Sequence, residues 1–252
     1  MSRPEDITPY DHSRGKTEQV REMFDNIAPA YDRLNRAMSL GQDKRWRRRA
    51  VEAVAAHDPR RIIDIATGTG DFAISLACAI ADAEVIGVDL SQGMIDIGCQ
   101  KVETAGLAER VRLIQGDCLN PPDVARGADA VTVAFGVRNF ADLAAGYRAM
   151  YDMLNPGGML CVIELSTPAN RLVIPFYNLY TRVLIPAMGR LVSKDRRAYS
   201  YLPESIAAVP RGDRMLALMR DAGFVNTRFQ TFTLGVCSMY IGFRPGDVPP
   251  TQ

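Results

Sequence analysis

From Arg61 onward, short runs rich in β-branched residues alternate with longer segments whose apolar residues recur at helical spacing. The expected strands are residues 61–66, 84–90, 111–116, 130–135 and 159–165, and the expected helices between them are residues 71–80, 92–105 and 141–154. A turn at Asn155-Pro156-Gly157-Gly158 ends the last of these helices. This alternation is typical of βαβ units, so we expect a parallel sheet with helices on its faces.

The end of the chain follows a different pattern. After a helix expected at residues 213–222, residues 225–244 alternate in polarity like two strands joined near Leu234 and Gly235. The sheet is therefore expected to finish with an antiparallel hairpin. The predicted fold class is α/β, Rossmann-like, with a mostly parallel seven-stranded sheet.

One α/β domain accommodates a chain of 252 residues. Residues 17–56 have a helical pattern around Pro29 and are expected to form a cap that precedes the core. We expect residues 1–16 to be a flexible arm, residues 17–252 to be a single domain, and residues 168–208 to be an insertion on the substrate side.

Charge and cysteine content exclude several classes of protein. The 30 basic and 29 acidic residues nearly balance, which removes the general electrostatic argument for nucleic-acid binding. The five cysteines are odd in number and show no C-x-x-C spacing, so we expect no disulfide framework and no metal site. The polar N-terminus and the interruption of the apolar stretch 172–192 by Pro175 and Arg182 favour a cytoplasmic protein without a membrane span.

A glycine-rich turn, Asp64-Ile-Ala-Thr-Gly68-Thr69-Gly70-Asp71, follows the first expected strand and begins a helix. Such a turn brings backbone N–H groups close to a ligand at the carboxyl edge of the sheet. Gly68, Gly70 and Ala73 also satisfy the dinucleotide fingerprint, and Asp89 lies near the spacing of a ribose-binding acid. Taken alone, the turn would therefore support a dehydrogenase.

Three further features favour a different cofactor. Asp64 ends the first strand, where a carboxylate attracts a cationic amine and repels a pyrophosphate. Asp117 and Cys118 follow the third strand at Gly116, where an acid and a neighbouring amide suit an adenine edge. Together with the terminal hairpin, these features resemble the class I methyltransferases that use S-adenosylmethionine (SAM). Asp89 is then the ribose ligand, or alternatively a helix cap.

Three longer motifs narrow the resemblance to one family. They are Met23-Phe-Asp-Asn-Ile-Ala-Pro-Ala-Tyr-Asp-Arg-Leu-Asn35, Phe135-Gly-Val-Arg138-Asn139 and Tyr199-Ser-Tyr-Leu-Pro-Glu-Ser205. The chain resembles, from about Lys16 to Arg244, the C-methyltransferases of ubiquinone and menaquinone biosynthesis. The resemblance implies methylation of 2-methoxy-6-polyprenyl-1,4-benzoquinol or demethylmenaquinol, with SAM contacts at Thr69, Asp89, Asp117 and Cys118. A further family position, often Ser, is Ala134 here and lacks the hydroxyl.

Methylation of a quinol carbon requires an electron-rich ring, which forms when a phenolic proton leaves. Arg138 is a candidate stabiliser of the phenolate, with Asn139 fixing orientation, although Arg138 is alternatively a partner of a structural carboxylate. His12 and His57 lie away from the expected site, so the proton leaves through water or a carboxylate. Glu164, at the end of the fifth strand, is the candidate carboxylate or else the cap of a turn.

Two segments bear on partners. The basic run 44–49 is either a solvated helix face or a contact for anionic lipid headgroups, and the stretch 172–192 is either a lid or an amphipathic element at a membrane surface. We expect a polyprenyl quinol as substrate, peripheral contact with the inner face of the membrane and association with other quinone-biosynthesis enzymes.

Two other functions remain open. A nucleic-acid methyltransferase is weakened because Asn120-Pro-Pro-Asp123 lacks the aromatic platform for a flipped base, so no nucleic-acid partner is expected. The other alternative is a non-catalytic SAM-binding partner in a biosynthetic assembly.

Overall fold

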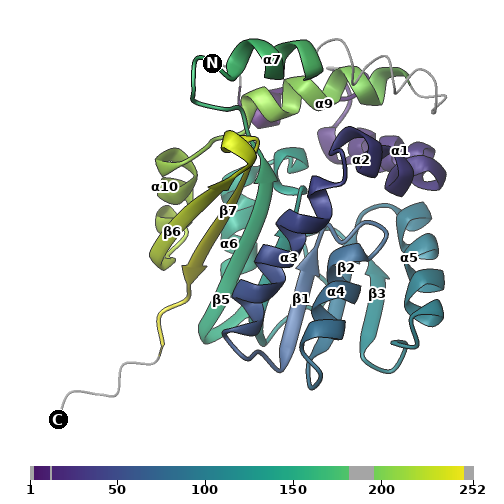
Figure 1. Ribbon diagram of the computed structural model, residues 1–252. Helices are drawn as coiled ribbons and strands as arrows, with labels where there is room; N and C mark the ends of the chain where they lie inside the picture. The colour runs from purple at the N-terminus through teal and green to yellow at the C-terminus, as the bar shows by residue number, and fades with distance from the viewer. Residues whose placement is uncertain (1–2, 12, 182–195, 247–252) are drawn as a thin grey trace.

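The computed structural model describes residues 3–11, 13–181 and 196–246, and its centre is a seven-stranded sheet in the order β3-β2-β1-β4-β5-β7-β6 (Figure 1). The strands are β1 (Arg61–Ile65), β2 (Glu84–Asp89), β3 (Val111–Gln115), β4 (Ala128–Ala134), β5 (Leu154–Leu165), β6 (Val225–Phe232) and β7 (Cys237–Phe243). β1 to β5 pair in parallel, whereas β7 runs antiparallel to both β5 and β6. The predicted fold class is confirmed, including the terminal hairpin.

Helices cover both faces of the sheet because successive strand residues point to opposite sides. Ile62 packs against α3 (Gln42–Ala55), α4 (Asp71–Ala79) and α5 (Gln92–Thr104). Its neighbour Ile63 packs in a second core with α6 (Leu143–Met153) and α10 (Asp213–Asp221). β1 is therefore buried on both faces, as is usual for a strand inside a parallel sheet.

The starts of β4, β5 and α6 differ from the sequence prediction. β5 begins at Leu154 rather than at residue 159, so the turn expected at residues 155–158 lies within this strand. β4 begins at Ala128, two residues earlier than expected, with a register irregularity before Ala130. α6 begins at Leu143 because the side chain of Asp142 accepts a hydrogen bond from the backbone N–H of Ala145 and caps the helix.

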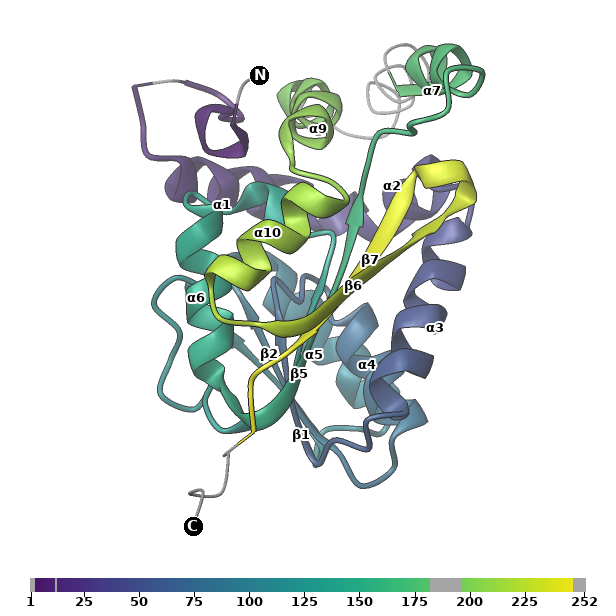
Figure 2. The same cartoon turned by 90° about the vertical axis from the view of Figure 1, so that its left-hand side faces the viewer.

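The N-terminal helices lie over the carboxyl edge of the sheet (Figures 1 and 2). They are a 3₁₀ turn η1 (Pro4–Asp6), α1 (Lys16–Ile27), a second turn η2 (Ala28–Ala30) and α2 (Tyr31–Met38). Within the stretch expected as a flexible arm, Pro4 is buried and its carbonyl accepts a hydrogen bond of 2.5 Å from Nζ of Lys16. The same Nζ donates to the carbonyl of Arg138 at 3.2 Å. His12 lies outside the described residues.

The expected insertion contributes α7 (Ile174–Leu179) and α9 (Arg196–Ala208), which lie above the same edge (Figure 2). Of the predicted amphipathic stretch 172–192, residues 182–192 are outside the described part of the chain. Tyr180 Oη donates to the carbonyl of Met38 at 2.7 Å and so joins the segment after α7 to the end of α2. Within the described ranges, no helix is both long and apolar enough to span a membrane.

Candidate active site

The glycine-rich turn connects β1 to α4 at the carboxyl edge. Gly68 and Gly70 have φ values of +57° and +77°, a left-handed backbone that favours glycine. Gly70 immediately precedes the first residue of α4. The turn thus lies beside the carboxylates of Asp64 and Asp89, near the ends of β1 and β2.

Asp64 lies under this turn with 1% of its surface exposed. Its two carboxylate oxygens accept hydrogen bonds of 2.6 Å from the hydroxyls of Thr67 and Thr132. Burial raises the pKa of Asp64 to about 6, although both hydroxyl bonds act in the opposite direction. Asp64 therefore has a buried carboxylate whose charge a nearby cation would stabilise.

Asp89, at the end of β2, is half-buried and joins the turn to the next helix. One carboxylate oxygen accepts from the backbone N–H of Gly68 at 2.8 Å and the other from that of Ser91 at 2.9 Å. Burial raises the pKa of Asp89. The N-cap of α5 is Ser91, whose hydroxyl accepts a hydrogen bond from the backbone N–H of Met94. The residue that caps this helix is therefore Ser91 and not Asp89.

A cavity of about 50 Å³, here called the glycine-turn cavity, lies beside these groups. Its lining brings together the predicted cofactor residues Gly68, Asp89, Asp117 and Cys118, along with Ala134. Cys118 is buried, which raises the pKa of its thiol, and Asp117 accepts a hydrogen bond from the backbone N–H of Leu119. On the cap side, the lining residues are Thr17, Val20, Phe24 and Tyr31.

Two aspartates of the cap bind residues that follow β1 and β2 at the carboxyl edge of the sheet. Asp25 of α1 accepts hydrogen bonds from the Ser91 hydroxyl at 2.6 Å and from the backbone N–H of Gly93 at 3.0 Å. Asp32 of α2 accepts from the hydroxyl of Thr69 at 2.6 Å. Thr69, a predicted cofactor contact, is therefore held by the cap.

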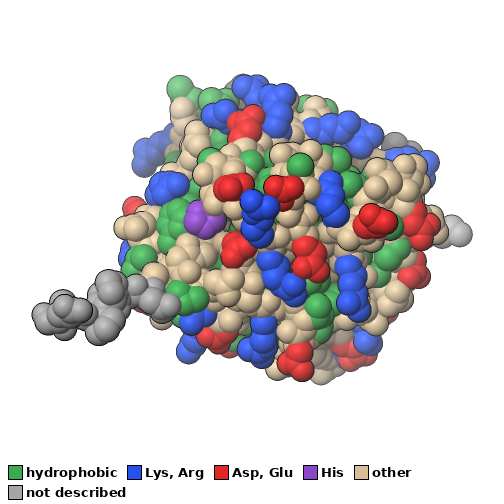
Figure 3. Space-filling model, turned by 90° about the horizontal axis from the view of Figure 1, so that it is seen from below, with side chains coloured by type: hydrophobic (Ala, Val, Ile, Leu, Met, Phe, Trp, Pro, Cys, Tyr) green, Lys and Arg blue, Asp and Glu red, His purple; other side chains and the backbone are tan. Residues whose placement is uncertain are grey.

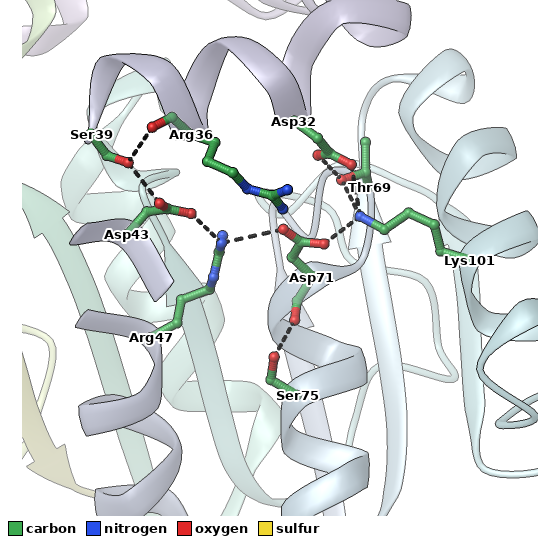
Figure 4. Close-up of polar contacts among 9 residues, drawn as sticks. All are labelled: Asp32, Arg36, Ser39, Asp43, Arg47, Thr69, Asp71, Ser75 and Lys101. Atoms are coloured by element: carbon green, nitrogen blue, oxygen red, sulfur yellow. Dashed lines mark hydrogen bonds and ion pairs between the residues drawn. The ribbon is translucent and has the colours of Figure 1, made fainter. Parts of the chain in front are cut away.

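A polar network extends from Asp32 around the start of α4 (Figure 4). Nζ of Lys101 contacts Asp32 at 2.9 Å and also pairs with Asp71. Arg47 lies between Asp43, at 2.5 Å, and Asp71, at 3.2 Å. Burial opposes ionisation of Asp71, but its hydrogen bond to Lys101 and the charge of Arg47 together lower its pKa. Asp71 of α4 thereby joins α3 and α5, and Lys101 extends the network to Asp32 of α2.

Arg138 and Glu164 form a buried ion pair. Arg138 lies in a 3₁₀ turn, η3 (Val137–Asn139), after β4, and Glu164 lies near the end of β5. Nη1 of Arg138 contacts Oε1 of Glu164 at 2.7 Å and also donates to the carbonyl of Phe135. Oε2 of Glu164 accepts from the backbone N–H of Arg138 at 3.1 Å. The structural pairing considered for Arg138 is therefore present.

This pair leaves one polar atom of Arg138 without a protein partner. Arg138 is 7% exposed, and its Nε is buried without a hydrogen-bond acceptor among the described residues. Glu164 is 1% exposed and accepts a third hydrogen bond from the backbone N–H of Leu165. Its other two hydrogen bonds both come from Arg138, so Glu164 holds that residue in place. Asn139, next to Arg138, lines the glycine-turn cavity and accepts a hydrogen bond of 3.1 Å from the hydroxyl of Tyr201.

A second cavity of about 420 Å³, here called the apolar cavity, lies between α2, α3, α7, α9 and the β6–β7 turn. Arg138 is part of its wall, and most other lining side chains are apolar or aromatic, among them Trp46, Phe135, Leu165, Tyr177 and Ile206. Nε1 of Trp46 donates to the hydroxyl of Thr233 at 2.9 Å, which fixes the indole ring. Tyr31 and Phe135 line both cavities, so the cavities share a wall.

The tyrosines near Arg138 divide between several places. Tyr31 and Tyr177 line the apolar cavity, whereas Tyr201 lines a smaller hollow together with Arg138 and Asn139. The side chain of Tyr199 is outside the described part of the structure. Sequence reasoning did not find Asp25, Asp32 or Lys101, although the two aspartates belong to the Met23–Asn35 motif and were a usable signal.

The arrangement is suited to group transfer between two bound molecules. One cavity borders carboxylates that attract a cation and hydroxyl groups, and the other is apolar with one buried guanidinium. A shared aromatic wall allows reacting atoms to meet without passing through water.

Comparison with known proteins agrees with this arrangement. Relatives include a protein of Bacteroides fragilis named demethylmenaquinone methyltransferase, 44% identical over 236 residues, which are 94% of this chain and 96% of that protein. A Geotalea daltonii protein named ubiquinone/menaquinone biosynthesis C-methyltransferase UbiE is 40% identical over 228 residues, 90% of this chain and 97% of that one.

Solved structures support the fold. A SAM-dependent methyltransferase of Thermotoga maritima, described as a possible histamine N-methyltransferase, has a TM-score of 0.61 and 19% identity over 89% of this chain and 99% of that chain. The [4+2]-cyclase SpnF has a TM-score of 0.66 and 16% identity over 92% of this chain and 97% of that one. The model of the ubiE/COQ5 methyltransferase family matches residues 12–244, and the chain belongs to that family.

Proposed function

We propose that the protein transfers a methyl group from SAM to a ring carbon of a polyprenyl quinol in ubiquinone or menaquinone biosynthesis. The observation that carries the proposal is the buried Nε of Arg138, which has no acceptor among the described residues, in a side chain that lines an apolar cavity. A buried N–H without an acceptor costs about 1–3 kcal/mol, and a phenolate oxygen would recover that energy. The names of the relatives support the same substrate class.

The glycine-turn cavity and its surroundings fit the chemistry of SAM. Asp64 would face the cationic amine, Asp89 would accept from the ribose hydroxyls, and Thr69, Asp117 and Cys118 would border the rest of the nucleoside. The cofactor supplies an electrophilic methyl group. Gly68 and Gly70 contribute a turn that a ligand can approach closely.

Arg138 is proposed to stabilise the phenolate, so that the adjacent carbon becomes nucleophilic. Glu164 is proposed as the positioning residue that fixes the guanidinium, because its oxygens already accept N–H groups. The phenolic proton passes to water before the carbon attacks. After the carbon has taken the methyl group, its own proton is also lost to water and the ring becomes aromatic again. Asn139, held by Tyr201, is proposed to orient the reacting groups from the side of the glycine-turn cavity.

We also propose roles for two segments of the chain, a location in the cell and partners. Residues 17–56 act as a cap within one methyltransferase domain, and residues 168–208 act as the insertion that encloses the quinol. The protein works in the cytoplasm at the inner face of the membrane and associates with other quinone-biosynthesis enzymes. The apolar cavity supports the first of these points because residues from both segments line it.

The experiment is quinone profiling of a strain without the gene, complemented by wild type or by Asp89→Ala. Wild type should restore the methylated quinone and Asp89→Ala should not. Full restoration by Asp89→Ala would instead support a non-catalytic partner. Transfer of tritiated methyl to RNA but not to extracted quinols would support a nucleic-acid substrate and contradict the proposal.

A further inference from the structure

Two leucines at turn tips border the apolar cavity. Leu40, between α2 and α3, is 74% exposed, and Leu234, in the turn η5 (Thr233–Gly235) between β6 and β7, is 73% exposed. Both belong to the cavity lining although they are far apart in the sequence. Two solvent-exposed apolar side chains therefore lie at the opening of one cavity, here called its mouth.

The backbone at both tips is unusual for leucine. Leu40 has a φ of +51° and Leu234 a φ of +56°, in the left-handed region that glycine and asparagine tolerate better. Exposure gains leucine no burial that would offset this strain. Their side chains thus contribute nothing to the isolated fold that asparagine would not match.

The surroundings of the mouth are apolar and basic. Leu172 is 81% exposed and precedes Val173, which lines the cavity, and Leu179 precedes the lining residue Tyr180. Between Tyr31 and Ala50 the acidic residues are Asp32, half-buried, and Asp43, buried, and both form ion pairs. The exposed charges near the Leu40 turn include Arg33, Lys44, Arg45 and Arg48.

The opposite end of the molecule differs. Figure 3 shows the face at the amino ends of the parallel strands, where acidic and basic side chains are interspersed. Of the basic residues near the Leu40 turn, Arg48 pairs with Glu52. Exposed leucines combined with exposed basic residues are what an interfacial contact with anionic lipid requires.

We propose that Leu40, Leu234, Leu172 and Leu179 form a docking rim that inserts into the surface of an anionic phospholipid bilayer, with the basic residues of α2 and α3 against its headgroups. The rim surrounds the mouth of the apolar cavity, so a lipid-soluble substrate passes from the bilayer into the protein without crossing water. This inference rests on the proposed function for that substrate, whereas the rim itself is tested by binding to lipid alone.

The test is flotation of the full chain with vesicles of phosphatidylcholine containing 30% phosphatidylglycerol, on the order of physiological anionic content, and with vesicles of phosphatidylcholine alone. Wild type should bind the anionic vesicles, and the double variant Leu40→Asn/Leu234→Asn should bind them at least about tenfold more weakly, because two apolar groups no longer leave water. Asparagine suits both φ values, so the melting temperature of the double variant should equal or exceed that of wild type.

Val225→Asn is the matched control, because Val225 is an exposed apolar residue of β6 outside the rim. It should bind vesicles like wild type. Lys44→Gln/Arg45→Gln should weaken binding to the anionic vesicles only.

Equal vesicle binding by wild type and the double variant would overturn the proposal. So would a wild-type dimer that the double variant converts to monomer without any change in vesicle binding, since the rim would then join two copies of this chain. If the rim variants behave as expected but wild type cannot methylate a short-chain, water-soluble quinol, the rim stands and the proposed function fails.

Discussion

The two cavities differ in size, polarity and closure, although they share Tyr31 and Phe135. The glycine-turn cavity measures about 50 Å³ and is lined on one side by the cap helices. The apolar cavity measures about 420 Å³ and has exposed leucines at its mouth. Cofactor-sized ligands occupy cavities of about 300–1,000 Å³. The glycine-turn cavity is smaller than this range, whereas the apolar cavity falls within it.

The two cavities also differ in the charged side chains beside them. Asp64 and Asp89 lie on the proposed cofactor side, and Arg138 is a buried cation of the proposed substrate side. A variant on one side should therefore leave binding on the other side intact. Variants on each side test whether binding to the two cavities is independent.

The largest expected effect is on stability. Glu164→Ala leaves the Arg138 guanidinium buried without its carboxylate, which should lower the free energy of unfolding by about 3–5 kcal/mol in urea titration. Glu164→Gln retains an acceptor and should lose less. A loss below about 1 kcal/mol for the alanine variant would mean that solvent reaches Arg138.

Arg138→Met should reduce kcat by about 10²–10³-fold, since one preorganised donor to a developing oxyanion is worth that much. The dissociation constant of SAM, measured by calorimetry, should stay within about twofold because Arg138 belongs to the apolar cavity. An equal loss in kcat and in SAM affinity would contradict the separation of the two sides.

Asp89→Ala should weaken SAM binding by about 10–100-fold, as expected for loss of charge-assisted hydrogen bonds. Binding of a quinol analogue to the apolar cavity, followed by quenching of the Trp46 fluorescence, should be unchanged. A parallel loss of quinol binding would show that the shared wall couples the cavities.

Acidification should weaken SAM binding from about pH 6 downward, by up to about tenfold per pH unit. The raised pKa of Asp64, about 6, means that its binding-competent carboxylate is present above that pH and lost below it. Asp89, whose pKa is also raised, adds to the loss in the same direction.

The contribution of Asp64 to folding has the opposite sign. Between its ordinary pKa of 3.8 and about 6, the folded state binds more protons, so its contribution to stability rises as pH falls. Asp64→Asn should remove its share of both effects. A SAM affinity that is flat between pH 7 and 5 would exclude Asp64 as the partner of the amine.

The smallest effect is expected at the mouth of the apolar cavity. Thr233→Val removes the acceptor of the Trp46 indole and should cost about 1 kcal/mol of stability, with a several-fold rise in KM for the quinol. Thr231→Val, on the preceding strand β6, is the control. A change in SAM affinity would contradict the expectation that Thr233 affects only the apolar cavity.

The sheet and the carboxylates at its edge follow from local sequence. Alternating β-branched runs predict β1 to β5, and a position at the end of a strand identifies Asp64 and Asp89. The contacts of Asp32 with Thr69 and Lys101 join residues 37 and 69 positions apart, which no local pattern records. Likewise, the pairing of Arg138 with Glu164 requires β4 and β5 to lie side by side. Periodicity predicts which residues are buried, but not which of them meet.

Lys16 carries a practical consequence for protein production. Its buried ammonium, whose pKa burial lowers to about 8, bonds the Pro4 carbonyl on one side and the Arg138 carbonyl on the other. Trimming the first fifteen residues to aid crystallisation would delete one of these two acceptors and disturb the loop that carries the guanidinium. Purification tags are better fused elsewhere, and kinetic data from shortened versions would describe an altered enzyme.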